Sequence, residues 1–330
     1  MTVRGLVLGK FMPFHQGHQY LIDFARTHCD ELIVLVCSIE SEPIGGALRY
    51  RWVRESCPPE VRVLHVTDEV PQEPSEHEDF WEIWRGLVLR HAGAPIHRVY
   101  ASDTYGERLA AEVGAAFVPV DIAREHVPVS GTSIRADPLG SWEYVPAAVR
   151  PHFVKRVSVF GPESTGKSTL ASALSRRFGT VAVREYARGY LEALGRPCEV
   201  EDMLPIAQGQ VAAEEAMARH ARRVLFCDTD PLATTLWSEA LFGRCDGLLL
   251  EIAGARRYDL TLLLDLDLPW VEDPVRYQPD EAARRSFFAS CQEALERRGR
   301  DYLVIRGDHS ERLAAATQAV DALIGGSSLR

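Results

Sequence analysis

Three observations predict an α/β fold made of two parallel-sheet domains. Short apolar runs alternate with stretches of helical length, which is typical of a parallel sheet covered by helices. The alternation occurs twice, and in each half a glycine-containing loop directly follows the first apolar run. The chain has 330 residues, which suits two domains of ordinary size better than one.

Five apolar runs in the N-terminal half are expected to form strands: residues 3–8, 31–37, 61–66, 97–101 and 115–119. Helices are expected between them, near residues 17–28, 47–56, 78–92 and 105–112. A further helix is expected to begin at Ser130 or Thr132, because a hydroxyl side chain there caps the free backbone N–H groups of a first turn.

Prolines and a glycine interrupt the pattern between residues 138 and 151, so the domain boundary is expected near residues 145–154. We assign residues 1–148 to a first domain and residues 149–330 to a second. The second domain has five strand candidates: residues 156–160, 181–184, 224–228, 260–265 and 302–305. Helices fill the gaps between them, with long ones near residues 201–222 and 280–299.

Composition and charge argue against several classes of protein. The chain is 46% hydrophobic and 25% charged, as in soluble globular proteins. Its 47 acidic and 37 basic residues give a net charge of −10, which argues against a nucleic-acid partner. No apolar run is long enough to cross a bilayer, and the N-terminus has no signal-peptide pattern. The seven cysteines form no C-x-x-C pair, which indicates a reduced, cytoplasmic protein without a zinc or redox site.

The loop at residues 161–168 matches the pattern G-x-x-x-x-G-K-[ST] in full, and it follows a strand candidate as that pattern requires. Its glycines allow the backbone to wrap closely round a phosphate, and Lys167 supplies a positive charge to the outer phosphates. The Ser168 hydroxyl is expected to bind Mg²⁺. The residues predicted to contact ATP here are Gly161, Glu163, Ser164, Thr165, Gly166, Lys167, Ser168 and Thr169.

A phosphate loop of this kind needs a carboxylate beside the metal, and Asp228 ends the apolar run 224–228. We predict that Asp228 binds Mg²⁺ together with Ser168. The alternative is that Asp228 caps a helix beginning at Pro231. Asp230 follows two residues later, and it either binds substrate at the same edge of the sheet or caps the helix that begins at Pro231.

Two more segments of the second domain have open roles. Glu185 and Tyr186 follow the strand candidate 181–184, and Glu185 is either a ribose ligand, a base or a solvated charge at a helix start. Residues 270–276 form a loop rich in charges, and Arg276 would reach the transferring phosphate if this loop closes as a lid. An ordinary surface loop is the alternative.

In the first domain, His15 and His18 flank Gly17 at a turn from strand to helix. Their spacing puts both imidazoles on one side of the helix start, where they and the free N–H groups can stabilise charge on an α-phosphate and a leaving pyrophosphate. Gly17 leaves room for a nucleotide, and Lys10 adds a positive charge. Metal binding is the alternative, although no third ligand is evident. ATP contacts are predicted at Gly9, Lys10, Phe11 and Gly17.

A second segment, residues 130–135, is expected to complete this nucleotide site. The hydroxyls of Ser130 and Thr132 and the helix start form a seat for an anion, and Arg135 can hold two phosphate oxygens at once. Alone, the segment is a weak motif that fits a simple helix cap equally well. Together with the two histidines it predicts a site for nucleotide phosphates.

Two clusters of the first domain are candidates for substrate binding. Trp81 and Trp84 share a helix face, and they either stack on a flat base or pyridine ring or fill the core. Arg51 and Trp52 belong with Arg49 and Arg54 to a basic, aromatic patch that either meets a phosphate or forms a solvated helix face.

The order and spacing of these motifs resemble the NadR-type bifunctional proteins, which combine a nicotinamide mononucleotide adenylyltransferase with a ribosylnicotinamide kinase. The resemblance covers nearly the whole chain and implies a Rossmann-like His-x-Gly-His nucleotidyltransferase domain followed by a P-loop kinase domain. Some members carry an N-terminal helix-turn-helix domain that represses transcription; this chain begins at the first strand of the transferase, so that role is not expected. Besides the two loops, the matching segments are Arg51-Trp52, Ser130-x-Thr132-x-x-Arg135, Pro146-x-x-x-Arg150-Pro151, Glu185-Tyr186-x-Arg188, Asp228-Thr229-Asp230 and Trp270-Val271-x-Asp273.

The resemblance implies that the second domain phosphorylates nicotinamide riboside with ATP. The first domain would then join nicotinamide mononucleotide to AMP, forming NAD⁺ and pyrophosphate. ATP and Mg²⁺ are the implied co-substrate and cofactor, the partners are small molecules, and a homo-oligomer is compatible with the sequence. The implied catalytic residues are His15, His18, Arg135, Lys167 and Asp228.

Two alternatives to this function stay open. A His-x-Gly-His transferase can act on another phosphorylated acceptor, such as pantetheine phosphate or glycerol phosphate. The P-loop domain can also be an ATPase or a regulatory sensor that binds nucleotide with little turnover.

Overall fold

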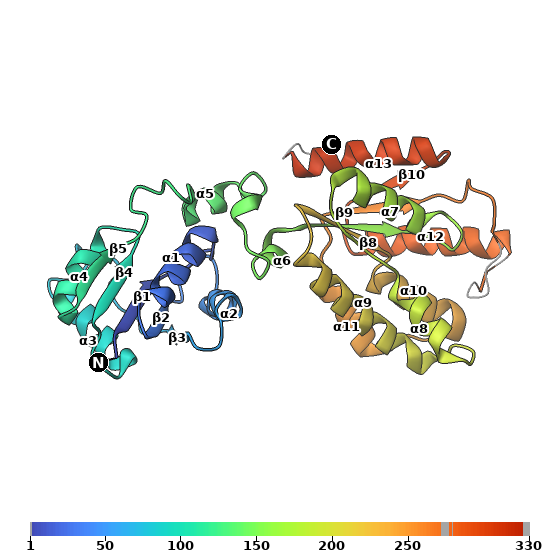
Figure 1. Cartoon of the computed structure of the whole chain (residues 1–330). Helices are drawn as coiled ribbons and strands as arrows, with labels where there is room; N and C mark the ends of the chain where they lie inside the picture. The colour runs from blue at the N-terminus through green and yellow to red at the C-terminus, as the bar shows by residue number, and fades with distance from the viewer. Residues whose placement is uncertain (1, 272–276, 279, 326–330) are drawn as a thin grey trace. The chain divides into compact units, whose positions relative to one another are not determined.

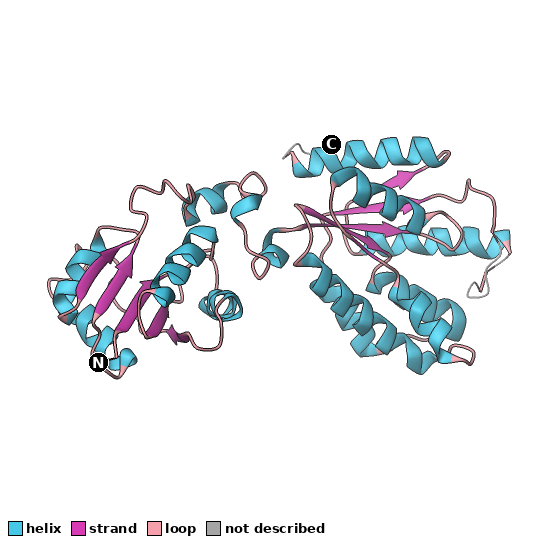
Figure 2. Cartoon of the chain, in the orientation of Figure 1, coloured by secondary structure: helices cyan, strands magenta, loops and turns pink. Residues whose placement is uncertain are grey.

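A computed structural model of the chain describes residues 2–271, 277–278 and 280–325. The chain divides into two compact units, Met1–Val149 and Arg150–Arg330 (Figure 1). Within the described residues, each unit contains one five-stranded sheet in which all neighbouring strands run parallel, with helices on its faces (Figure 2). The predicted α/β fold with two parallel sheets is confirmed.

The sheet of the first unit has the strand order β3-β2-β1-β4-β5, so that β1 lies at its centre. The sequence explains this position, because β2 and β1 are nearly continuous apolar runs, as buried parallel strands require. The strands are β1 (Arg4–Gly9), β2 (Glu31–Cys37), β3 (Arg62–Val66), β4 (Arg98–Ala101) and β5 (Ala116–Pro119).

A helix follows each strand of this sheet along the chain. One core lies between the sheet and the helices α3 and α4, where Leu87, Val88 and Leu109 pack near Leu6 and Ile33. The helices are α1 (Gln16–Thr27), α2 (Gly46–Ser56), α3 (Phe80–Ala92), α4 (Tyr105–Val113), α5 (Gly131–Ala136) and the short 3-10 turn Trp142–Tyr144.

The second unit repeats the plan with the strand order β10-β9-β6-β8-β7, and β6 is its central strand. The edge strand β7 has two residues, fewer than the sequence predicts, because pairing with β8 covers only Ala182 and Val183. The strands are β6 (Lys155–Phe160), β7 (Ala182–Val183), β8 (Val224–Asp228), β9 (Leu260–Leu264) and β10 (Tyr302–Ile305).

Helices cover both faces of the second sheet. One core joins it to α7 and α13 through Leu170, Leu174 and Val320, and another joins it to α10 and α12 through Leu232 and Phe287. No helix in the described part of the chain combines the length and apolar character that crossing a membrane requires. The helices are α6 (Arg150–Phe153), α7 (Lys167–Phe178), α8 (Tyr186–Leu194), the 3-10 turn Val200–Asp202, α9 (Met203–Ala218), α10 (Pro231–Phe242), α11 (Gly247–Ala255), α12 (Glu281–Arg297) and α13 (His309–Ile324).

Candidate active sites

The loop between β6 and α7 has the geometry of a phosphate cradle. Gly161 has φ +131°, and a Cβ atom there would lie 2.9 Å from the carbonyl oxygen of Leu264, so this position requires glycine. Arg312 on α13 donates to the carbonyl oxygen of Thr165 at 2.7 Å and ties the loop to the fold. The loop thus presents the N-terminus of α7, which favours an anion.

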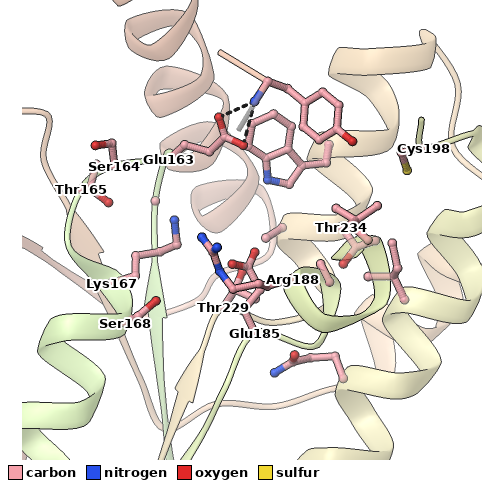
Figure 3. A pocket seen from close by; sticks show the side chains of 18 of the residues that line it. Glu163, Ser164, Thr165, Lys167, Ser168, Glu185, Arg188, Cys198, Thr229 and Thr234 are labelled. Atoms are coloured by element: carbon pink, nitrogen blue, oxygen red, sulfur yellow. Dashed lines mark hydrogen bonds between the residues drawn. The ribbon is translucent and has the colours of Figure 1, made fainter. Parts of the chain in front are cut away.

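Lys167 and Ser168 are the first residues of α7 and line the cavity that this loop opens on (Figure 3). The ammonium group of Lys167 donates to the carbonyl oxygen of Pro162 at 2.7 Å, which keeps it over the loop. Both residues therefore stand where the sequence motif predicts a phosphate charge partner and a metal-binding hydroxyl.

Asp228 ends β8 beside these residues, with 4% of its side chain exposed. Burial raises the pKa of its carboxyl group, while the charge of Lys167 and a hydrogen bond to Ser168 oppose the shift. Its buried Oδ1 atom has no hydrogen-bond partner among the described residues. An unsatisfied carboxylate oxygen next to a serine hydroxyl and a phosphate loop fits a divalent cation.

The described residues contain no group of three or more His, Cys, Asp or Glu side chains that could hold a metal by itself. Mg²⁺ ions in nucleotide sites take most of their ligands from substrate phosphates and water. Ser168 and Asp228 would supply the protein's ligands to such an ion.

The cavity at the phosphate loop has a volume of about 350 Å³ and extends from the loop into an apolar, aromatic compartment. Trp237 of α10 belongs to this compartment and stacks on Phe287 with ring centroids 4.3 Å apart. These residues carry no sequence motif, so the sequence analysis missed them. Besides the loop, the lining includes Glu185, Ala187, Arg188, Leu191, Cys198, Met203, Ile206, Gln210, Thr229, Ala233, Thr234, Trp237, Leu241 and Tyr277.

Glu185 and Tyr186, the two candidate substrate ligands after β7, lie in different places in the structure. Glu185 lines the cavity near Lys167 and Asp228, and burial raises the pKa of its carboxyl group against the opposing charge of Lys167. Tyr186 instead lies in the adjoining groove beside α7, with 41% of the residue exposed and its ring against Gly209. Its backbone N–H donates to Gln210 at 3.0 Å, which holds the cavity wall formed by α9.

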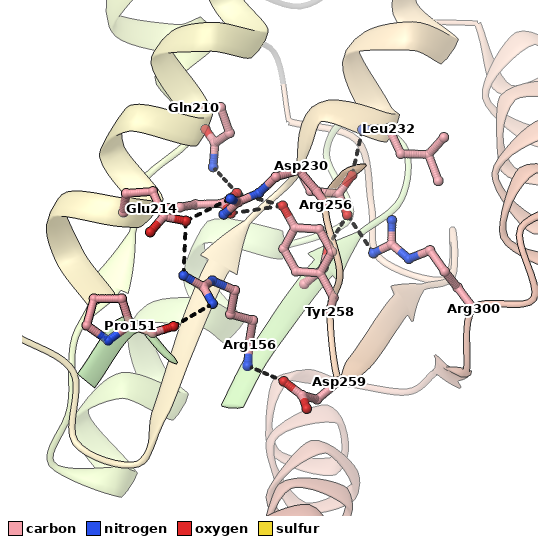
Figure 4. Close-up of polar contacts among 12 residues, drawn as sticks. Pro151, Arg156, Gln210, Glu214, Asp230, Leu232, Arg256, Tyr258, Asp259 and Arg300 are labelled. Carbon is pink, nitrogen blue, oxygen red and sulfur yellow. Dashed lines mark hydrogen bonds and ion pairs between the residues drawn. The ribbon is translucent and has the colours of Figure 1, made fainter. Parts of the chain in front are cut away.

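Asp230 does not reach the cavity, and this placement corrects the expectation that it binds substrate. Its fully buried carboxylate accepts hydrogen bonds from the N–H of Leu232, the hydroxyl of Ser158 and the guanidinium of Arg300, at 2.8, 2.8 and 2.7 Å (Figure 4). The β-region backbone of Asp230 makes it the N-cap of α10. A carboxylate with these three partners stabilises a helix start and has little capacity left for a ligand.

A second buried carboxylate belongs to the same region. Glu214 of α9 accepts from Arg256 at 2.7 Å and from the hydroxyl of Tyr258 at 2.8 Å, and Gln210 lies 3.4 Å away (Figure 4). The guanidinium of Arg300 lies over the ring of Tyr258, 4.7 Å from its centroid. These contacts fix α9 and the start of α10, which carry two walls of the cavity.

Arg276 and Asp273 lie outside the described residues, so the predicted lid has no structural account.

The loop between β1 and α1 places both predicted histidines together. His15 is the N-cap of α1, and its Nδ1 atom accepts the backbone N–H of His18 at 3.3 Å. The two rings stack with centroids 3.7 Å apart. Because Nδ1 of His15 is an acceptor, its proton in the neutral form sits on Nε2, which can donate to a ligand.

Both histidines are neutral at physiological pH. Burial and then the charge of Arg124 lower the pKa of His15 to about 4. Burial, His15 and Arg124 lower the pKa of His18 well below its usual value. The formal positive charges of this site therefore come from Lys10, Arg124 and Arg135, while the histidines act as neutral hydrogen-bonding groups.

The segment around Arg135 meets the histidine loop, as the sequence predicts. The guanidinium of Arg135 donates to the carbonyl oxygen of Met12, and also to the hydroxyl of Thr132 at 3.2 Å. A Cβ atom at position 131 would lie 2.6 Å from the same Met12 oxygen, so the close approach requires Gly131. Ser130 caps the helix through Ser133, which leaves the N-terminus of α5 facing the loop.

These two segments line one cavity of about 600 Å³. Trp81 and Trp84 are also part of its lining. Trp84 is 9% exposed and donates its indole N–H to the carbonyl oxygen of Pro71 at 2.9 Å, whereas Trp81 is half-buried. The predicted site residues in this cavity are Gly9, Lys10, Phe11, His15, Gly17, His18, Trp81, Trp84, Ser130, Thr132 and Arg135.

Among the described residues that line this cavity, Arg51 and Trp52 are absent. Trp52 of α2 is 3% exposed and lies in the core, while Arg51 of the same helix is exposed. The neighbouring Arg49, which belongs to the same predicted patch, is fully buried and donates to the carbonyl oxygen of Lys10 at 2.6 Å. Arg49 also pairs with Glu42, whose other oxygen lies 3.3 Å from the ammonium group of Lys10.

Two parallel-sheet units, each with a phosphate-binding loop at the carboxyl end of its central strand, define a protein with two separate nucleotide sites. The protein-family description "AAA domain" matches residues 156–312. The chain is 30% identical over 97% of its length to the trifunctional NAD biosynthesis/regulator protein NadR of Escherichia coli K12, covering 83% of that protein. The chain therefore belongs to the NadR family.

Other relatives agree with this assignment. The NadR protein of Salmonella typhimurium LT2 is 29% identical over the same share of both chains. A nicotinamide-nucleotide adenylyltransferase of Methanospirillum hungatei is 28% identical over 44% of this chain and 84% of its own. A crystal structure of a NadR protein in complex with NR has the same fold, with a TM-score of 0.80 and 24% identity over 100% of this chain and 98% of that one.

Proposed function

We propose that this protein catalyses two consecutive steps of NAD formation. The second unit phosphorylates nicotinamide riboside with ATP, and the first joins the resulting mononucleotide to AMP. The proposal is supported by family membership. Its principal structural support is that each unit has its own phosphate loop opening on its own cavity.

In the kinase site, the work of the protein is mainly positioning and charge stabilisation. Lys167 and the N-terminus of α7 would hold the phosphates that the acceptor hydroxyl attacks. Glu185 lies near Lys167 in the cavity wall, and the raised pKa of its carboxyl group suits a proton acceptor for that hydroxyl. The aromatic compartment around Trp237 offers an apolar surface for a flat acceptor ring.

Mg²⁺ bound by Ser168 and Asp228 would neutralise charge on the phosphates. The unsatisfied Oδ1 atom of Asp228 supports this assignment.

In the adenylyltransferase site, the mononucleotide phosphate attacks the α-phosphorus of ATP, the bond to the β-phosphate oxygen breaks, and pyrophosphate leaves. His15 and His18 would donate hydrogen bonds from neutral rings to the developing negative charge. Lys10 and Arg135 supply formal positive charge from the two segments that meet at Met12. The neutral histidines would thus act as hydrogen-bond donors, while Lys10 and Arg135 would act as the cations that the sequence predicts.

The direct test is a time course with nicotinamide riboside and ATP, followed by mass spectrometry. We expect the mononucleotide to form first, with ADP, and NAD⁺ with pyrophosphate to follow. Formation of a different dinucleotide from another phosphorylated acceptor, without any NAD⁺, would contradict the proposal.

Separate substitutions test whether the two sites work independently. Lys167→Ala is expected to abolish riboside phosphorylation and leave NAD⁺ formation from added mononucleotide within about twofold. His18→Ala is expected to do the reverse, with a loss on the order of 10²–10³ in adenylyl transfer. Lys155→Ala, at a surface ion pair with Asp259, is the matched control and is expected to affect neither. Loss of both activities in either folded variant would contradict two independent sites.

A further inference from the structure

Glu163 places a carboxylate inside the loop that is built to bind phosphates. A negative charge directed at a nucleotide would repel it. The side chain of Glu163 is directed elsewhere. Its two carboxylate oxygens accept the backbone N–H of Tyr277 at 2.9 and 3.2 Å (Figure 3). One of these oxygens also accepts the backbone N–H of Gln278 at 3.1 Å.

Tyr277 lines the same cavity as Trp237. The residue is 42% exposed and belongs to no helix or strand. Its backbone position is therefore set by local contacts, of which the two bonds to Glu163 join it to the phosphate loop. A carboxylate that accepts two backbone N–H groups makes charge-assisted hydrogen bonds, which are stronger than neutral ones.

We propose that Glu163 is a positioning residue for the acceptor of the kinase reaction. By holding the backbone at Tyr277 and Gln278, it positions the Tyr277 ring as a cavity wall beside the flat ring of a nucleoside. It thereby connects the part of the cavity that binds the acceptor to the loop that binds the phosphates. This inference rests on the proposed kinase function. It assigns Glu163 a role different from the ATP contact that the sequence motif predicts.

The kinetic test compares Glu163→Ala, Glu163→Gln and Tyr277→Ala in the full chain. Glu163→Ala is expected to raise KM for nicotinamide riboside about tenfold, the effect of losing one net hydrogen bond to a charged group, and to leave KM for ATP within about twofold. Glu163→Gln keeps an acceptor oxygen and is expected to show a smaller increase. Glu163→Ala in a Tyr277→Ala background should add little, because both changes remove the same wall.

Glu293→Ala is the control, since Glu293 is an exposed glutamate of α12 that pairs with Arg297. It is expected to leave both KM values unchanged. A Glu163→Ala variant with a raised KM for ATP and an unchanged KM for the riboside would overturn the proposal, and so would full additivity with Tyr277→Ala.

A second measurement separates this proposal from the proposed function. Hydrogen exchange at the backbone amides of Tyr277 and Gln278 needs no acceptor, and Glu163→Ala is expected to accelerate it more than tenfold over the wild-type chain. Unchanged exchange would overturn the role of Glu163 even if the riboside is phosphorylated. Accelerated exchange in a protein that does not phosphorylate the riboside would instead refute the kinase function alone.

Discussion

The burial of His15 determines how the first site responds to pH. His15 is the N-cap of α1 and accepts the N–H of His18 at its Nδ1 atom, while burial and then the charge of Arg124 lower the pKa of the ring from 6.5 to about 4. Below pH 6.5 the unfolded chain binds a proton that the folded chain resists binding. Stability is therefore lost as the pH falls from 6.5 towards 4 and changes no further below both pKa values.

Replacing His15 by asparagine tests this reasoning at the scale of one residue. Asparagine is a good N-cap and does not titrate, so the helix start is kept while the proton linkage is removed. Between pH 7 and pH 5 the wild-type chain should lose about 2 kcal/mol more unfolding free energy than His15→Asn. Urea unfolding at the two pH values measures this difference, and equal losses in both proteins would show that His15 titrates normally.

For single residues, the sequence predicts the position of a side chain where a motif fixes the backbone that carries it. His15, Lys167 and Asp228 stand where the pattern places them, because a strand end and a helix start fix their backbone. The sequence does not predict residues such as Trp237 that reach a cavity from the middle of a helix. Trp52 shows the opposite error, since its helix turns that side chain into the core.

At the scale of secondary structure, the N-terminus of α10 shows why two nearby aspartates differ. Strand β8 directs Asp228 to the phosphate loop, whereas Asp230 has turned into the N-cap of the following helix. From sequence spacing alone both carboxylates were candidates for one site. The hydrogen bonds of Asp230 to Leu232, Ser158 and Arg300 keep its carboxylate out of the cavity. Two of these partners come from distant parts of the chain, Ser158 from β6 and Arg300 from the loop before β10, so the sequence near Asp230 does not reveal them.

The role of Asp230 as a buried cap can be measured by substitution. Asp230→Ala leaves the guanidinium of Arg300 buried without its carboxylate and should destabilise the second unit by about 3–5 kcal/mol. Asp246→Ala removes the exposed N-cap of α11, which accepts the N–H of Leu248 at 2.8 Å, and serves as the matched control with an expected cost of about 1 kcal/mol. Both values come from urea unfolding. An equally stable Asp230→Ala variant with a raised KM for the riboside would place Asp230 in the substrate site after all.

The strands were predictable to within one or two residues wherever an apolar run is bounded by polar residues, as in β2 and β8. The edge strand β7 is one residue shorter at each end than the predicted 181–184, because its length depends on how far it pairs with β8.

At the scale of the whole molecule, each unit has its own sheet and its own buried clusters. A ligand of one unit should therefore stabilise that unit without the other. Nicotinamide riboside at 100 times its Kd is expected to add about 2.7 kcal/mol to the second unit, which raises its midpoint by roughly 5–11 °C. Scanning calorimetry should show one transition moving and another staying in place. A single transition that moves as a whole would show that the units unfold together.

The positions of β1 and β6 at the centres of their sheets affect how activity is lost on heating. A strand paired on both sides detaches only when its neighbours do, so fraying at the rim of a sheet leaves the catalytic turns untouched. The two turns that follow these strands should accordingly keep their shape through partial opening of their domains and be lost together with cooperative melting.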